Sequence, residues 1–338
     1  MKRILKWLAL ALGLVFLGWY VSRADLEAIG GALRELGWLA PLVLLPYFCV
    51  YIADCIGWRM AFPEKPGVSF LTLLRIRWAG ESFNNVIPSA YVGGEALKVF
   101  LLRGHGVPGG VGAASAVVSK TAQTVAQVLL ITLASIVFWQ IGGNYPGLRP
   151  GMMAVFVCGV LVVLGLFWIQ KRGLLSVLSS IARAAGLQLK AVESRREKIQ
   201  AVDQTISGFY RRHPRRFLAS TGFYLCGWLL DTTEILLVSH LLEMPITWWQ
   251  ALCVEAFTGV AKALGMWIPG SLGVQESGIV MLGRLAGLPD ALSFTYALLR
   301  RAREIVFALV GWALLYGHEQ VFSMKPPSPQ STHDVGRQ

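Results

Sequence analysis

The chain has 338 residues, of which 55% are apolar and only 15% are charged. Several apolar runs approach or exceed the roughly 20 residues that a helix needs to cross a bilayer. This composition excludes an ordinary soluble domain and predicts an all-α polytopic membrane protein. The net charge of +12 is not accompanied by aromatic residues interleaved with the basic ones, so we expect no binding of nucleic acid.

Six apolar runs with few charges are predicted to span the membrane. The first follows Lys2 and Arg3 and is longer than the apolar core of a typical signal sequence, so it is expected to remain as an uncleaved span. Residues 68–78, which include Arg75 and Arg77, are expected to lie at the cytoplasmic interface as an amphipathic stretch. The predicted spans are Ile4–Val21, Trp38–Met60, Gly112–Trp139, Met152–Ile169, Phe217–Leu242 and Ala291–Tyr316.

The basic residues are concentrated in one segment. Between Lys171 and Arg216 the chain has eleven Lys and Arg but only three acidic residues. The positive-inside rule places this segment in the cytoplasm, where it is expected to lie against anionic lipid. Both termini are then cytoplasmic, and the polar tail 319–338 is expected to be disordered. The protein is accordingly predicted to reside in the cytoplasmic (inner) membrane.

Two segments that lie 181 positions apart share a sequence pattern. Residues 87–95 read IPSAYVGGE and residues 268–276 read IPGSLGVQE. Extending this register without gaps to Gln123 gives nine identities in 37 pairs, whereas about three are expected by chance. The pattern predicts one integral membrane domain, residues 1–318, with repeat halves at about 38–140 and 217–318 joined by a span (151–169) and the basic segment (170–216).

The two halves are predicted to have opposite orientations, since the long span of each half crosses the membrane in the opposite direction. Proline and glycine interrupt residues 80–103 and 250–285: Pro88 removes a backbone donor, and Gly93 and Gly94 permit strained turns. Non-helical backbone at membrane depth must be surrounded by protein or water. The fold predicted is therefore an inverted-topology repeat of about six full spans plus two re-entrant helical hairpins, about eight or more transmembrane elements, whose hairpin tips meet near the midplane.

Ionisable residues lie inside these apolar segments, although each costs about 2.5–3.5 kcal/mol on insertion scales. Arg301 and Glu304 are three residues apart on one helix face and are expected to pair, and Lys120 is expected to pair with Glu95 across elements. Each charge alone is explained most simply by a satisfied ion pair, whereas the set at equivalent places in both halves indicates a polar path. Others in or near apolar segments are Asp54, Glu81, Asp231, Glu234, Glu255, Lys262, Glu276, Arg300 and Arg303.

The hairpin tips are the predicted substrate region. The helices that begin near Gly94 and Ser271 are expected to direct free N–H groups and a partial positive charge at an anionic head group. Asn84 and Asn85 are expected either to cap or line the first hairpin or to contact substrate. The residues predicted to form the substrate path are Asn84, Asn85, Pro88, Gly93, Gly94, Glu95, Lys120, Pro269, Gly273, Glu276, Arg301 and Glu304.

The sequence WAGESFNNVIPSAYVGGEALKVF (residues 78–100), followed by LLRGHGVP, resembles the signature of a flippase-like membrane family named for the transmembrane region of lysylphosphatidylglycerol synthase. Its wording is most similar to the branch found with hopanoid biosynthesis. The resemblance implies a polytopic helical fold with two re-entrant elements and lipid translocation between leaflets. The soluble aminoacyl transferase domain of the synthase has no counterpart here, so lysyl-lipid synthesis is not expected. The functional positions that the resemblance implies are Asn85, Pro88, Gly93, Gly94, Glu95, Pro269, Gly273 and Glu276.

The leading functional interpretation is a lipid translocase that moves an anionic or polar-headed lipid through a polar cavity between the hairpins. The lipid could be a phospholipid, a polyprenyl-linked lipid or a hopanoid, and no Walker-type nucleotide motif is present. One alternative is a membrane-embedded enzyme on a lipid-linked substrate with Glu95 or Glu276 as acid or base, although no catalytic motif supports it. Another is an ion-coupled transporter of a small polar solute. No metal or cofactor is expected, because the scattered His and Cys residues show no ligand spacing.

Overall fold

The computed structural model describes residues 25–87, 92–141, 149–172, 196–265 and 267–317, together with Val15 and Ser22. Within these ranges the chain is helical and has no β-strand, as predicted for an all-α protein. The first predicted span, Ile4–Val21, lies outside the described residues apart from Val15, and so does the tail 319–338.

The helices follow the predicted apolar runs closely. Where spans were predicted, helix ends differ from the predicted ends by at most three residues, and the second predicted span is divided into a 3₁₀ helix, η1, followed by α3. In chain order the elements are α2 (Leu26–Leu36), η1 (Gly37–Val43), α3 (Leu44–Met60), α4 (Phe70–Val86), α5 (Val92–Gly104), α6 (Gly109–Ile141), α7 (Arg149–Arg172), α10 (Arg196–Arg212), α11 (Pro214–Leu241), α12 (Trp248–Leu264), η3 (Pro269–Ser271), α13 (Val274–Leu285) and α14 (Asp290–Tyr316).

Local sequence signals explain several helix ends. The Ser69 hydroxyl accepts a hydrogen bond from the backbone N of Thr72 at 3.1 Å and so caps α4. Helix α4 ends at Val86, two residues before a proline, because a proline disfavours helical geometry in the residue that precedes it. Helix α11 begins with Pro214, whose missing N–H is not needed at the first position of a helix.

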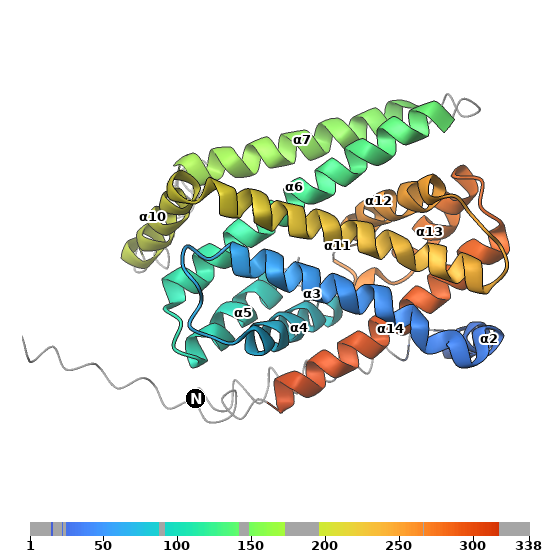
Figure 1. Ribbon diagram of the computed structural model, residues 1–338, viewed down its shortest axis with the longest axis horizontal. Coiled ribbons are helices and arrows are strands. Elements are labelled where there is room, and N and C mark those ends of the chain that lie inside the picture. The colour runs from blue at the N-terminus through green and yellow to red at the C-terminus, as the bar shows by residue number, and fades with distance from the viewer. Residues whose placement is uncertain are drawn as a thin grey trace, which may run out of the picture.

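The two predicted repeat halves pack against each other. Helix α3 lies along α11, its counterpart in the other half, through the middle of the molecule (Figure 1). The hairpin α4–α5 packs through α4 against α14, and the hairpin α12–α13 packs through α12 against α6, so each hairpin contacts the long helix of the other half. Shifting Val92 and Gly109, where α5 and α6 begin, by 181 positions gives 273 and 290, which are the N-cap of α13 and the first residue of α14.

The breaks within the hairpins also approach each other, because η3, which separates α12 from α13, contacts α4. Pro88 lies outside the described residues, so the expected closeness of Pro88 and Pro269 stays a prediction. By length and hydropathy, two described helical runs are long and apolar enough to cross a bilayer, Leu26–Met60 and Gly109–Val137. The other long helices α11 and α14 carry buried charges, and the number of six full spans stays a prediction.

Part of the basic segment is a helix that packs on the others. Helix α10 buries Ile206 and Phe209 and contacts α6, α7 and α11. At the start of α11, the Arg216 guanidinium donates to the carbonyl oxygens of Arg59 and Met60 in the last turn of α3 and of Pro63 just beyond it, each at 3.3 Å. The basic segment is thus fixed to the α3–α11 pair at this end, and residues 173–195 lie outside the described residues.

Candidate functional site

In the first hairpin, α4 and α5 approach each other closely at Gly94. The backbone N of Gly94 donates a hydrogen bond to Asn84 Oδ1 at 2.7 Å. A Cβ on Gly94 would lie 2.2 Å from the carbonyl oxygen of Gly80, so a side chain there would force the helices apart. The prediction that Gly93 and Gly94 form strained turns is wrong, because both lie in helix α5. Asn84 joins the two helices of the hairpin, which is one of its two predicted roles.

Glu95 forms its ion pair within its own helix. Its Oε1 lies 2.7 Å from Lys98 Nζ, one turn further along α5. The ammonium of Lys98 is buried and lies 5.6 Å from the centre of the Trp58 ring. Lys120, the partner expected for Glu95, donates instead to Gln123 Oε1 at 3.0 Å on α6. The closest partner of each is thus its own neighbour at i+3, and the expected pairing of Lys120 with Glu95 stays a prediction.

The break of the second hairpin is formed by left-handed residues. Gly270 and Gly273 have φ angles of +60° and +80°, and Ser271 has +51°. The backbone N of Gly273 donates to Glu276 Oε2 at 2.9 Å. The N-terminus of α13 was expected to offer free N–H groups to an anionic ligand. The carboxylate of Glu276 occupies that place, because an acidic side chain in the first turn complements the partial positive charge of the helix.

Arg301 and Glu304 connect the second hairpin to α14. Arg301 Nη1 donates to Glu304 Oε2 at 2.8 Å and to the Gly270 carbonyl oxygen at 3.0 Å, and the guanidinium also pairs with Glu276. Glu304 Oε1 accepts from Lys262 Nζ at 3.0 Å and from Gln275 Nε2 at 3.1 Å. The expected pairing of Arg301 with Glu304 is confirmed. One buried carboxylate thus joins α12, α13 and α14.

A second buried cluster joins α11, α12 and α14. Arg300 Nη2 lies 3.0 Å from Glu255 Oε1 and 3.3 Å from Asp231 Oδ2. Arg303 Nη1 lies 2.9 Å from Asp231 Oδ1 and also pairs with Glu234. None of these residues is more than 4% exposed. Buried ionised groups are stable only when paired. The two arginines and three carboxylates of this cluster therefore depend on one another.

Arg77 pairs with Asp54 between α4 and α3, and both side chains are buried. The prediction that residues 68–78 lie at the cytoplasmic interface is therefore wrong for Arg77. Arg75 is exposed, as an interfacial residue would be. Two residues apart on an α-helix means about 200° of rotation, so the face that carries Arg77 points inward.

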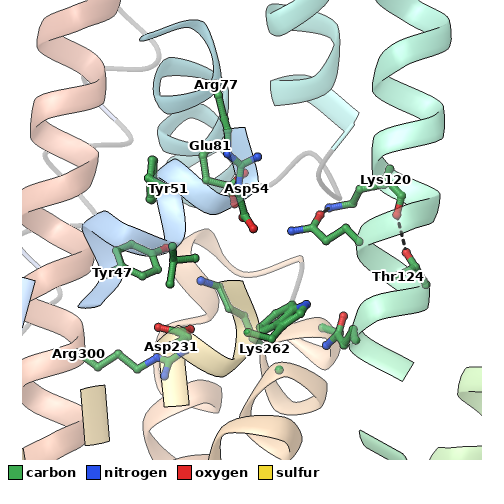
Figure 2. Close-up of a pocket in the computed structure, with 16 residues that line it drawn as sticks. Tyr47, Tyr51, Asp54, Arg77, Glu81, Lys120, Thr124, Asp231, Lys262 and Arg300 are labelled. Carbon is green, nitrogen blue, oxygen red and sulfur yellow. Dashed lines mark hydrogen bonds and ion pairs between the residues drawn. The ribbon is translucent and has the colours of Figure 1, made fainter. Parts of the chain in front are cut away.

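These groups surround a cavity of about 260 Å³. In Figure 2, Asp54, Arg77 and Glu81 lie together on one side, Asp231 and Arg300 lie across from them, and Lys120 projects from α6. The walls come from both predicted halves: α3, α4 and α6 from the first, and α11, α12 and α14 from the second. The charged residues that line the cavity are Asp54, Arg77, Glu81, Lys120, Asp231, Lys262 and Arg300.

Of the residues predicted to form the substrate path, Lys120 lines this cavity. Arg301 and Glu304 lie behind Lys262, and Glu276 pairs with Arg301. Asn85 is buried at the end of α4, Pro269 opens η3, and Gly273 precedes α13. Pro88 lies outside the described residues. The assignment of these residues to a substrate path stays a prediction.

Six charged cavity residues are not among the residues named for the substrate path, namely Asp54, Arg77, Glu81, Asp231, Lys262 and Arg300. All except Arg77 belong to the set of ionisable residues in apolar runs that the sequence indicated as a polar path. Which of these charges face the same space depends on how the helices cross, and that information is not local in the sequence.

Comparison with known proteins agrees with the geometry. The family model for the lysylphosphatidylglycerol synthase TM region matches residues 6–311. The chain belongs to this family. The UPF0104 membrane protein PH1989 of Pyrococcus horikoshii is 25% identical over 273 residues, covering 77% of this chain and 81% of the relative. No solved structure matches the chain.

Membership of the lysylphosphatidylglycerol synthase TM region family makes this a membrane protein with helical spans, related to lipid handling. The matched residues 6–311 include both hairpins and all the helices that line the cavity. The buried ion pairs described above all lie within the matched residues.

Proposed function

We propose that this protein is a flippase-like lipid translocase. It moves a lipid with an anionic or other polar head group between leaflets of the cytoplasmic membrane, without nucleotide hydrolysis. The head group occupies the cavity between the hairpins while the acyl chains stay in the bilayer. In this proposal α4–α5 and α12–α13 are re-entrant hairpins of an inverted repeat, both termini are cytoplasmic, and residues 171–216 rest on anionic lipid.

The observation that carries the proposal is the polar cavity. Buried ion pairs can often be replaced by apolar residues without loss of stability. Stability alone therefore does not explain why so many charged side chains face an open space. Here seven charged side chains surround about 260 Å³ of open space within a membrane domain. Such groups can replace the hydration that a lipid head group loses when it leaves the membrane surface.

The matching of the two halves supports the inverted repeat. Helices α5 and α13, and likewise α6 and α14, begin within one residue of equivalent positions, and each hairpin packs on the long helix of the opposite half. The cavity is formed by three helices from each half, which is the arrangement expected for a substrate site at a repeat interface.

Transport of fluorescent phospholipids by the purified protein in vesicles tests the proposal. Wild-type vesicles should expose the inner-leaflet probe to an external quencher, whereas protein-free vesicles should retain about half of their fluorescence. Gly259→Leu should block transport, because a Cβ on this cavity residue already comes within 2.6 Å of Gln127 Nε2.

Gly222→Leu in α11 is the matched control, since a Cβ at Gly222 has no neighbour within 4 Å. It should transport as the wild type does. Wild-type vesicles that behave like empty ones would refute lipid translocation. Normal transport by a correctly folded Gly259→Leu protein would show that lipid moves elsewhere.

The same vesicles separate the alternatives. A membrane-embedded enzyme would alter its lipid chemically, which mass spectrometry of the recovered lipid would detect. An ion-coupled solute transporter would leave the fluorescent lipid in its original leaflet. Replacing the probe with polyprenyl-linked lipid or hopanoid tests the lipid class, including the resemblance of the first hairpin to the hopanoid-associated branch.

A further inference from the structure

Glu81 differs from the other carboxylates of the cavity wall. Asp54 pairs with Arg77, and Asp231 pairs with Arg300 and Arg303. Glu81 lies one turn beyond Arg77 on α4 and lines the same cavity. Among the residues that the structure describes, its carboxylate has neither a hydrogen bond nor an ion pair. Lys98, Arg77 and the other nearby cations act on it through space and not by a direct contact, so its carboxylate oxygens can contact the cation of a ligand in the cavity.

The charge of the cavity wall indicates what kind of ligand that is. Four basic and three acidic side chains line the cavity. Behind the wall, Glu304 pairs with Lys262 and Glu255 pairs with Arg300. The basic residues therefore have no excess over the acidic ones. A purely anionic head group would bring an unbalanced charge into a region of low dielectric, whereas a zwitterionic head group would not.

The repeat register places opposite charges at equivalent positions of the cavity wall. Shifting Glu81 by 181 positions gives Lys262, so equivalent places on α4 and α12 carry a carboxylate and an ammonium, and both line the cavity. Lys120, on α6, adds a second ammonium to the wall. An ammonium has three donors, so Lys120 can donate to a ligand while it also donates to Gln123.

We propose that the cavity binds a zwitterionic head group that carries both a phosphate and an ammonium. Glu81 contacts the ammonium of the ligand, and Lys120 and Lys262 contact its phosphate. Trp228 lines the same cavity and is the type of aromatic side chain that best favours a cation. This assignment rests on the proposed function of the cavity and defines its substrate as a zwitterionic phospholipid.

Transport of two lipids with identical tails tests the assignment. Phosphatidylethanolamine has the phosphate and the ammonium, whereas phosphatidylglycerol has the phosphate alone. Wild type should move the ethanolamine lipid about tenfold faster, the factor expected for one charged hydrogen bond. Glu81→Gln should remove that preference, and Glu81→Asp should retain part of it. Lys120→Gln should slow both lipids, because the phosphate is common to them.

Thermal melting of the detergent-solubilised protein is a second readout that does not depend on transport. Phosphoethanolamine should raise the Tm of wild type more than glycerol phosphate does, and Glu81→Gln should lose the difference. A wild type that moves no lipid but shows this difference would refute translocation and support the head-group site.

Other outcomes would overturn the site and leave translocation in place. Equal transport of the two lipids, unchanged in Glu81→Gln, would be one. A second such outcome would be that a pH gradient drives transport in the wild type and that Glu81→Gln loses this transport equally for every lipid. Glu81 would then be a site of proton binding.

Discussion

Replacing Gly94 with alanine tests how closely the first hairpin is packed. The added Cβ would lie 2.2 Å from the Gly80 carbonyl oxygen and 2.4 Å from Asn84 Oδ1, whereas ordinary contacts are 3.4–4 Å. Because one of these atoms belongs to the backbone, α4 and α5 must separate by about 1 Å. Overpacking of this kind costs about 1–3 kcal/mol. Loss of the hydrogen bond from Gly94 N to Asn84 adds about 0.5–1.5 kcal/mol, so the free energy of unfolding is expected to fall by about 1.5–4.5 kcal/mol.

Thermal melting in detergent, monitored by fluorescence-detection size-exclusion chromatography, measures this effect. Gly222→Ala is the matched control, because the Cβ there has no neighbour within 4 Å and alanine is the better helix former. Gly94→Ala should melt well below the wild type, and Gly222→Ala at or above it. Equal melting of the two variants would show that the helices of the first hairpin do not approach as described.

Three further predictions concern buried contacts, and melting in detergent measures each of them. Arg303→Gln should destabilise by about 3–5 kcal/mol, because it strands Glu234 and leaves Asp231 with Arg300 alone, whereas Arg284→Gln, whose pair with Asp290 is exposed, should melt as the wild type does; similar losses in both would contradict the burial of the cluster. Glu95→Gln should destabilise more than Glu276→Gln, because buried Lys98 then loses its ion pair while Arg301 keeps Glu304, and the reverse order would refute these pairings. Gly311→Ala should lower the Tm, since its Cβ would lie 1.9 Å from Ser82 Oγ across the α4–α14 contact; an unchanged Tm would show that the contact is looser.

The helices were predictable because their signal is local. An apolar run of sufficient length and a capping residue lie within one stretch of sequence, and the predicted ends therefore fell close to those of α6, α11 and α14. The amphipathic stretch at 68–78 failed because exposed Arg75 and buried Arg77 are alike in sequence. Only the rotation of α4 against α3 and Asp54 distinguishes them.

The pairing of charges was predictable only where it is local. Arg301 and Glu304 are three residues apart, and this spacing indicated their ion pair. Glu95 was assigned to Lys120 on another helix, although Lys98, three residues further along α5, is its partner. Likewise, Glu276 was recognised as part of the second hairpin, but its hydrogen bond to Gly273 N follows from the left-handed turn before α13. Repeats locate equivalent residues, yet the partners of those residues have diverged between the halves.

The buried charges therefore fall into two groups with different consequences for mutation. Substituting Arg303 or Glu304 leaves a partner charge stranded, so any loss of activity would be mixed with loss of the fold. Glu81 lines the same cavity, and among the described residues no ion-pair partner depends on it. Glu81→Gln should therefore keep the fold, and its effect on lipid selectivity reports on the cavity itself. A fall in transport without a fall in Tm at this position would separate function from stability more cleanly than substitution within the paired clusters.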